Sequence, residues 1–123
     1  KAKMVVTSPS FLEPSLQDFD LHEEWYSLKN FADDLHVILA QDSTGMKGDM
    51  YQRPRFPATW VRRHGQGRVF YTSMGHREDV WTNPLFERLL LGGLAWAFGQ
   101  TSPDVTPNID RVTPHAREMP KKG

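Results

Sequence analysis

The feature that most constrains the fold is a glycine-rich turn between two short runs of β-branched and aromatic residues. The runs are Ala58–Arg63 and Arg68–Ser73, and the tetrapeptide His64-Gly65-Gln66-Gly67 separates them. Short strand-like runs divided by a glycine-bearing turn are typical of a β-hairpin. Glycine adopts positive φ without steric cost, which a tight reversal of the chain requires. The sequence therefore predicts a two-stranded hairpin in this region.

A helix is predicted soon after the hairpin. Asn83 can cap its first turn, and Pro84 suits the first helical position. Apolar residues at the spacing of one buried helical face follow at Phe86, Leu89, Leu90, Leu94 and Ala97. Gly92 and Gly93 each cost about 1 kcal/mol relative to alanine in a helix, so we expect the helix to approach a sheet closely there. Gly99 fits the position that ends the helix.

The rest of the chain carries weaker signals. Met4–Val6 is a short apolar run that predicts a strand without a clear pairing partner, and Ser8–Phe19 reads as an irregular connection. His36–Gln41 is nearly all apolar and predicts a buried strand, with His36 as a hydrogen-bonded structural histidine at its edge. Asp42–Arg55 is predicted to be a long polar loop. Gln100–Gly123 has several prolines and no apolar period, which predicts a linker or tail.

Length and composition limit the classes of function. The chain has 123 residues, enough for one small domain, and fifteen basic and fifteen acidic side chains that leave no net charge. That balance argues against a nucleic-acid-binding protein, and the longest apolar run, Leu89–Leu94, is too short to cross a bilayer. The chain has no cysteine, which excludes disulfides, thiolate metal ligands and a cysteine nucleophile. We assign no set of metal ligands, and the sequence indicates neither a cofactor nor a cellular compartment.

Three stretches carry a resemblance to a known family. They are Trp60–His76, the tetrapeptide Asn83-Pro84-Leu85-Phe86, and Leu89–Gly99 with its Trp-Ala-Phe-Gly end. Together and in this order they resemble the closing half of a ThuA-like (trehalose-utilisation) domain. The resemblance extends over residues 5–99. Two positions depart from the family's pattern: His64 stands where tyrosine or phenylalanine is expected, and Ser8 stands where a histidine often precedes the proline.

The resemblance implies an α/β fold, as part of a flavodoxin-like or class I glutamine amidotransferase-like three-layer domain. Residues 1–99 would form the C-terminal portion of a ThuA-like domain, and residues 100–123 a polar, proline-containing tail or linker. Because the family's domain is considerably longer, its opening strands and helices would come from outside this chain, either because the chain is a fragment or because a partner chain supplies them.

The resemblance also implies a role in carbohydrate utilisation, through binding or processing of a small sugar. The alternative is a non-catalytic ligand-binding or protein-interaction module of the same fold, since one fold hosts many functions. Glutamine amidotransferase chemistry is a poor fit. The spacing His76-x-Glu78 resembles the histidine and acid of those enzymes, but the cysteine that such a pair would activate is absent.

His76 is the residue we most expect to carry chemistry. It follows the second predicted strand of the hairpin, next to Gly75, and precedes the predicted helix. In open α/β sheets ligands bind outside the carboxyl ends of the strands, and the free amides of a helix N-terminus favour anions and polarised oxygens. An imidazole there could serve as general base, metal ligand or hydroxyl-binding group. The alternative is that His76 only caps the loop.

Two neighbouring carboxylates form a second candidate. Glu23 and Glu24 follow His22, and such groups can act as a metal ligand or general base. Adjacent residues on a strand point to opposite faces, so at most one of the two serves a given site. We assign Glu24 as a catalytic candidate and Glu23 as substrate-binding. The alternative is a solvated turn in which Trp25 and Tyr26 anchor the segment to the core.

Three aromatic residues are candidates for substrate binding. Aromatic faces suit the apolar faces of pyranose rings, so Trp60, Tyr71 and Trp81 could stack on a sugar. The alternative is that all three pack in or around the core.

Overall fold

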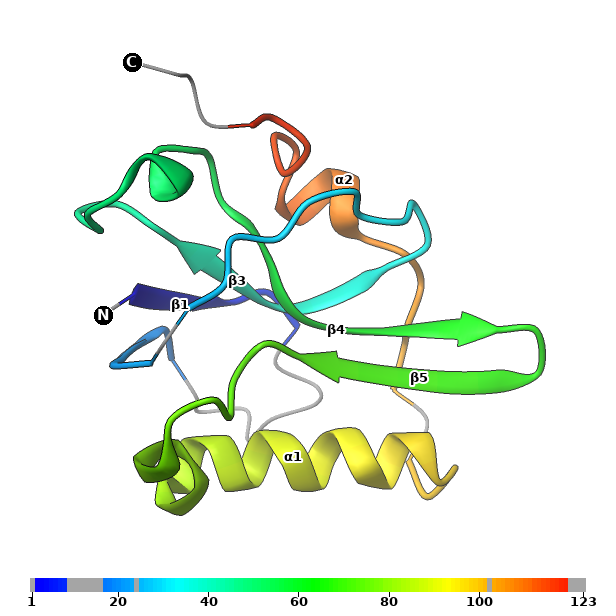
Figure 1. Cartoon of the computed structure of the whole chain (residues 1–123). Helices are drawn as coiled ribbons and strands as arrows, with labels where there is room; N and C mark the ends of the chain where they lie inside the picture. Colours follow the sequence, from blue (N-terminus) through cyan, green and yellow to red (C-terminus); the bar gives the residue numbers. More distant parts are fainter. Residues whose placement is uncertain (1, 9–16, 24, 102, 120–123) are drawn as a thin grey trace.

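A five-stranded antiparallel sheet forms the centre of the computed structural model (Figure 1). The structure describes residues 2–8, 17–23, 25–101 and 103–119. The strands are β1 (Ala2–Val6), β2 (Phe19–Leu21), β3 (His36–Asp42), β4 (Phe56–His64) and β5 (Gly67–Thr72). Their order in the sheet is β2-β1-β3-β4-β5, and all neighbouring strands run antiparallel. A hairpin followed by a helix within an α/β fold is confirmed.

The antiparallel pairing bears on the expected three-layer domain. A flavodoxin-like sheet is mostly parallel, and parallel neighbours require a crossover connection, usually a helix. Within the described residues, no α-helix lies between two strands in the chain. The three-layer assignment therefore stays a prediction.

The predicted hairpin is confirmed as β4 and β5, paired from Thr59 with Thr72 to His64 with Gly67. Gly65 supplies the positive φ of the turn, +59°. Gly67 serves a different purpose from the one we expected. Its φ is not positive, and a Cβ at this position would lie 3.2 Å from the carbonyl oxygen of His64. The turn thus needs one left-handed glycine and one that leaves room for the backbone.

Two of the weaker strand predictions are also confirmed. The run at Met4–Val6 lies in β1, which pairs with β2 on one side and with β3 on the other. The sequence did not reveal these partners because β2 has only three residues. Strand β3 lies in the middle of the sheet, and its residues from Val37 to Ala40 are fully buried.

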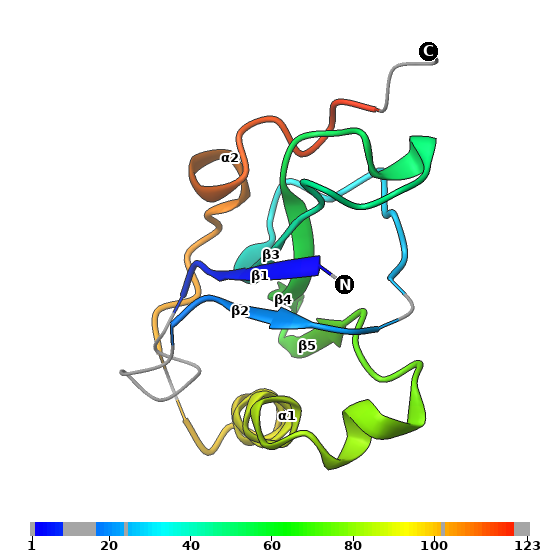
Figure 2. The same cartoon turned by 90° about the vertical axis from the view of Figure 1, so that its left-hand side faces the viewer.

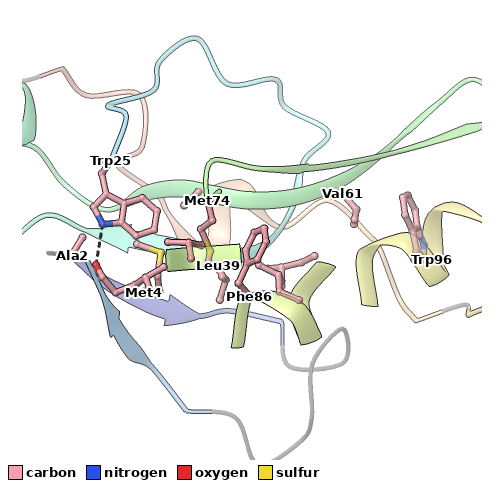
Figure 3. Packing of buried hydrophobic residues seen from close by; sticks show 13 residues of the cluster. Ala2, Met4, Trp25, Leu39, Val61, Met74, Phe86 and Trp96 are labelled. Carbon is pink, nitrogen blue, oxygen red and sulfur yellow. Dashed lines mark hydrogen bonds between the residues drawn. The ribbon is translucent and has the colours of Figure 1, made fainter. Parts of the chain in front are cut away.

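Helix α1 (Pro84–Ala97) covers one face of the sheet. Figure 2 shows the sheet between α1 and the short helix α2 (Ile109–Val112). Between the sheet and α1 lies a cluster that includes Met4, Leu39, Met74 and Phe86 (Figure 3). The helix begins as predicted, because the side chain of Asn83 accepts a hydrogen bond of 2.9 Å from the amide of Leu85.

The expected close approach of α1 to the sheet is confirmed at Gly93. A Cβ on this residue would lie 2.4 Å from the ring of Phe70 on β5. Gly93 belongs to the buried side of the helix, together with Phe86, Leu89 and Trp96.

The prediction that Leu94 is buried is wrong. Leu94 is 41% exposed, and it joins Leu91 (67%) and Phe98 (75%) in an apolar stripe on the outer side of α1. The helix is apolar almost all round, so spacing alone could not show which of its apolar rows meets the sheet. The sheet covers one row and leaves the second exposed.

The described part of the C-terminal segment differs from the linker or tail that the sequence predicts. Val105 packs against the cluster beneath α1, whereas Ile109 and Ala116 are buried on the opposite face of the sheet, against a cluster that includes Val37 and Phe56. The pattern was missed because α2 is a single turn. The position at which the family's domain ends stays a prediction.

Candidate functional site

The loop after β5 is anchored by a buried carboxylate. Glu23, 6% exposed, accepts hydrogen bonds from three successive backbone amides. Its Oε2 lies 2.8 Å from the amide of Gly75 and 3.2 Å from that of His76, and its Oε1 lies 2.8 Å from that of Arg77. Successive amides that converge in this way form a concave anion-binding site. Here the protein's own carboxylate fills it, so Glu23 fixes the path of the loop.

This contact changes the reading of the acidic pair. The alternative of a solvated turn does not hold for Glu23, whose carboxylate is buried and bound to backbone. The same bonds occupy both of its oxygens, which argues for positioning of the loop instead of substrate binding. Glu24, our second catalytic candidate, lies outside the described residues.

Gly75 allows the loop to turn outward. Its φ is +108°, a conformation that other residues rarely adopt, and a Cβ there would lie 3.4 Å from the indole of Trp81. The indole Nε1 of Trp81 in turn donates a hydrogen bond of 2.9 Å to the Gly75 carbonyl. The loop is therefore held from both sides at this residue.

His76 follows with its side chain exposed. Its ring stands edge-to-face with the ring of Tyr26, with the centroids 6.0 Å apart and an angle of 72° between the planes. Arg77, Glu78 and Asp79 line a shallow, open hollow together with His76. The backbone of this residue thus helps to hold the loop, while its imidazole meets the surface beside an aromatic ring.

The sequence did not predict the short helix that follows His76. This 3₁₀ helix, Glu78–Thr82, precedes α1 in the chain, and the side chain of Asn83 accepts a hydrogen bond in the first turn of α1. The 3₁₀ helix has one buried residue, Val80, which gives no periodic signal in the sequence. The chemistry of His76 must therefore come from its own surroundings.

Those surroundings carry more negative than positive charge. Arg77 pairs with Asp79 at 3.0 Å, and the hydrogen bond from Arg77 holds the pKa of the Asp79 carboxyl below its usual value. Glu78 is exposed in the same hollow, and the Glu23 carboxylate lies directly beneath the loop. Among the described residues, the carboxylates of Glu23, Glu78 and Asp79 lie near His76 with the guanidinium of Arg77, and His22 is close enough to Asp79 to lower its pKa slightly.

Tyr26 is the site residue that the sequence analysis missed. In the alternative interpretation of the acidic pair, Trp25 and Tyr26 both anchor the segment. Trp25 is buried and donates a hydrogen bond of 3.2 Å to the Leu21 carbonyl, but Tyr26 is 47% exposed. The signal was available, since neighbouring residues in an extended segment point to opposite sides. The carbonyl of Trp25 also accepts a hydrogen bond from the hydroxyl of Tyr51, which holds the backbone before Tyr26.

Trp60 and Tyr71 are brought together, as cross-strand neighbours on β4 and β5. Their rings stack with centroids 4.3 Å apart, and Phe31 meets Trp60 edge-on at 5.9 Å. Burial raises the pKa of the Tyr71 phenol, and the nearby phenol of Tyr26 raises it further. Tyr71 thus links the aromatic stack to Tyr26 and, through it, to His76.

A second hollow adjoins this stack. Trp60 and Tyr71 line it together with the segment from Leu28 to Ala32 and with Arg62, whose guanidinium binds Asp34 at 2.9 Å. Trp81 is not part of this group. It packs edge-on against Phe86, which belongs to the cluster beneath α1.

Two other histidines have structural surroundings. The prediction for His36 is confirmed, since it is buried, with Ser8 Oγ 2.7 Å from its Nε2 and the Thr106 carbonyl 2.7 Å from its Nδ1. Because a carbonyl only accepts hydrogen bonds, Nδ1 is the donor in the bond to Thr106. His115 is exposed and lies 2.5 Å from Glu118. Within the described residues, no three His, Asp or Glu side chains converge as a metal site would require.

Comparison with known families agrees with the resemblance of the sequence. A family model described as ThuA, trehalose utilisation, matches residues 2–97. The chain belongs to the ThuA family. No curated protein and no solved structure matches it. The ThuA match includes Glu23, Tyr26, Trp60, Tyr71 and His76.

The family suggests a role in trehalose utilisation for this ThuA chain. None of the helices in the described ranges of the chain has the length and apolar character needed to cross a membrane.

Proposed function

We propose that this ThuA-family chain binds a sugar at the loop that carries His76, and that His76 contacts the sugar directly. The observation that carries this proposal is the anchoring of the loop, in which one buried carboxylate accepts three successive backbone amides. A loop held in this way keeps its shape without a ligand. His76 is then presented at a defined place on the surface, beside Tyr26.

The chemistry available at His76 suits sugar hydroxyls. A neutral imidazole has one nitrogen that donates and one that accepts a hydrogen bond, so it can bind a hydroxyl or take its proton as a general base. Glu24 remains our candidate for a second catalytic group. Trp60 and Tyr71 offer apolar surface in the adjoining hollow, and Trp81, 55% exposed next to Gly75, offers a further ring on the other side of the loop.

The alternative function, a non-catalytic interaction module, also has an observation in its favour. The stripe formed by Leu91, Leu94 and Phe98 exposes three large apolar side chains on one side of α1. Single exposed apolar residues are common, whereas contiguous ones often mark interaction sites. Under this proposal the remaining part of a three-layer domain, or a partner chain, covers the stripe.

The two functions are separated by a sugar titration. We expect calorimetry with trehalose, maltose and glucose to show binding of at least one sugar. His76→Ala should weaken this binding by about tenfold, the upper end of the effect of losing one hydrogen bond between neutral groups. His115→Ala is the matched control, because His115 is an exposed histidine far along the chain. Equal loss in both variants would contradict a site at His76. Absence of binding to every sugar would favour the interaction module.

A further inference from the structure

We propose that Tyr26 is a further substrate-contacting residue and that the site selects neutral, unphosphorylated sugars over anionic ones. This inference rests on the proposed sugar site at His76 and adds a second contact residue and a charge preference. It is carried by the contact of the exposed Tyr26 ring with His76, and by the carboxylates around the loop.

Tyr26 is held in place although its ring is exposed. The residue before it, Trp25, is buried, its indole donates to the Leu21 carbonyl, and its own carbonyl accepts from Tyr51. These contacts fix the backbone at Tyr26. A large aromatic ring that is nearly half exposed on a fixed backbone forms binding surface at little cost in conformational entropy.

The ring of Tyr26 faces two other candidate residues. Its edge-to-face contact with His76 places an imidazole 6.0 Å away between centroids. Its phenol is also close enough to Tyr71 to raise the pKa of that residue, which is already raised by burial. The phenol of Tyr71, like that of any tyrosine, is protonated at neutral pH and can donate a hydrogen bond. The cluster combines aromatic surface with hydroxyl donors and an imidazole, groups that suit the ring face and hydroxyls of a sugar.

The charges near His76 oppose a phosphate or carboxylate on the ligand. The three amides that could have bound an anion are already occupied by Glu23. Glu78 and Asp79 line the hollow, and Arg77, the cation among its described lining residues, is paired with Asp79. An anionic sugar would meet carboxylates without a free guanidinium, and like charges brought together in a site suppress binding.

The adjoining hollow has two cations among its described lining residues, Arg62 and Lys29. Arg62 is held by both oxygens of Asp34, at 3.1 and 2.9 Å. Lys29 lines the same hollow, on the side of the Trp60 and Tyr71 stack. A neutral sugar that spans from His76 to this stack would contact the imidazole at one end and the aromatic rings at the other.

The test compares matched ligands with and without a phosphate. We expect calorimetry at low salt to show that trehalose or glucose binds at least about tenfold more tightly than its 6-phosphate. The difference should shrink as salt is added, since exposed charges are screened. Glu78→Lys should narrow it by raising the affinity for the phosphate.

Two variants test Tyr26. Tyr26→Phe removes only the hydroxyl and should weaken binding of the neutral sugar about fivefold, the loss of roughly one hydrogen bond. Tyr26→Ala should weaken it further because the ring is lost as well. Thermal melts of both variants should match that of the parent chain, because the ring is exposed. A melt that falls in Tyr26→Ala but not in Tyr26→Phe leaves the phenylalanine variant as the deciding one.

The outcomes distinguish this inference from the sugar site itself. Equal or tighter binding of the 6-phosphate, or unchanged affinity in Tyr26→Phe, would overturn the inference while the site at His76 stands. If no sugar binds with or without phosphate, the proposed function fails and the inference fails with it. A neutral preference together with a loss in Tyr26→Phe supports both.

Discussion

Glu23 determines the shape of the candidate site although it does not reach the surface. Its carboxylate accepts hydrogen bonds from the amides of Gly75, His76 and Arg77, which lie in a part-buried loop. Hydrogen bonds to a charged group contribute more than those between neutral groups. The residue that binds the loop and the residue that we expect to bind the ligand are therefore different, and they can be tested apart.

Glu23→Gln should lower the free energy of unfolding by about 1.5–3 kcal/mol, the range for hydrogen bonds to a charged group. The substitution keeps the size of the side chain but turns one acceptor oxygen into a donor that faces backbone N–H groups. Urea unfolding followed by fluorescence measures the change.

Glu78→Gln is the control for this prediction, because Glu78 is exposed in the same loop. It should change the free energy of unfolding by no more than about 0.5 kcal/mol, as surface substitutions do. If both variants unfold at the same urea concentration, Glu23 does not anchor the loop.

At the level of single residues, the sequence predicted the candidates better than their roles. His76 was identifiable because a glycine and a histidine follow a strand. The role of Glu23 was not, because it depends on backbone amides more than fifty positions further along the chain. Tyr26 was missed because two adjacent aromatic residues were both assigned to the core, although an extended backbone can bury only one of them on a given side.

Helix α1 depends on a glycine where it meets the sheet. At Gly93 the ring of Phe70 occupies the space that a side chain would take. Gly93→Ala should raise the helix propensity of α1 by about 1 kcal/mol. It should nevertheless lower the free energy of unfolding overall, because overpacking a well-filled contact costs typically 1–3 kcal/mol. Chemical unfolding measures the sum.

A double mutant separates these two effects. Phe70→Leu removes part of the ring that a Cβ at position 93 would strike, so adding Gly93→Ala to it should cost less than adding it to the parent chain. Residues in contact show such non-additivity, whereas distant ones do not. Strictly additive changes would mean that Phe70 and Gly93 do not meet.

Element length explains which secondary structure could be predicted. The hairpin and α1 have turn, cap and periodicity signals spread over many residues, and both were predicted. Strand β2, the 3₁₀ helix at Glu78–Thr82 and α2 have three to five residues each. Such short elements contain fewer than two full periods of their pattern, so their existence depends on tertiary contacts that the sequence does not display.

At the scale of the whole molecule, the C-terminal segment is attached to the sheet by hydrogen bonds and an ion pair. The side chain of Asn108 pairs with the backbone of Val37 like a neighbouring strand, accepting at 2.6 Å and donating at 3.2 Å. Arg53 donates 2.7 Å to the carbonyl of Ala116, and Arg117 pairs with Asp33 at 2.6 Å. These contacts attach residues 103–119 to β3 and to the loops on the face opposite α1.

A chain truncated after residue 102 should therefore melt more than about 10 °C below the full chain or lose its cooperative transition. Removal of the segment exposes the cluster around Val37 and Phe56, and each 1 kcal/mol shifts the melting temperature of a small domain by roughly 4–8 °C. Calorimetric melts of the two chains decide the matter. If the truncated chain melts like the full one, the segment is a tail after all.

Asn108→Ala is the point-variant counterpart of the truncation. It leaves the backbone amide of Val37 without its partner and should cost about 1–3 kcal/mol, the penalty for an unsatisfied buried group. Agreement in direction between the variant and the truncation would locate the effect at this contact.

At the scale of the molecule, the composition of the C-terminal segment misled the prediction. Prolines and polar residues are typical of linkers, yet a buried asparagine and a few apolar side chains suffice to attach a segment when they meet backbone groups that a sheet leaves open. The pairing of the strands could likewise not be predicted from the sequence, because β1 pairs with β3 more than thirty residues further along the chain.

The way in which Glu23 holds its loop has a consequence for how this site can change. The carboxylate recognises main-chain amides, which every residue except proline possesses. Only Gly75, with its left-handed backbone, is tied to its identity. The residues at positions 76 and 77 can therefore be substituted while the loop keeps its path. A scaffold of this kind allows natural variation, or directed evolution, to alter the chemistry of a surface without having to rebuild it.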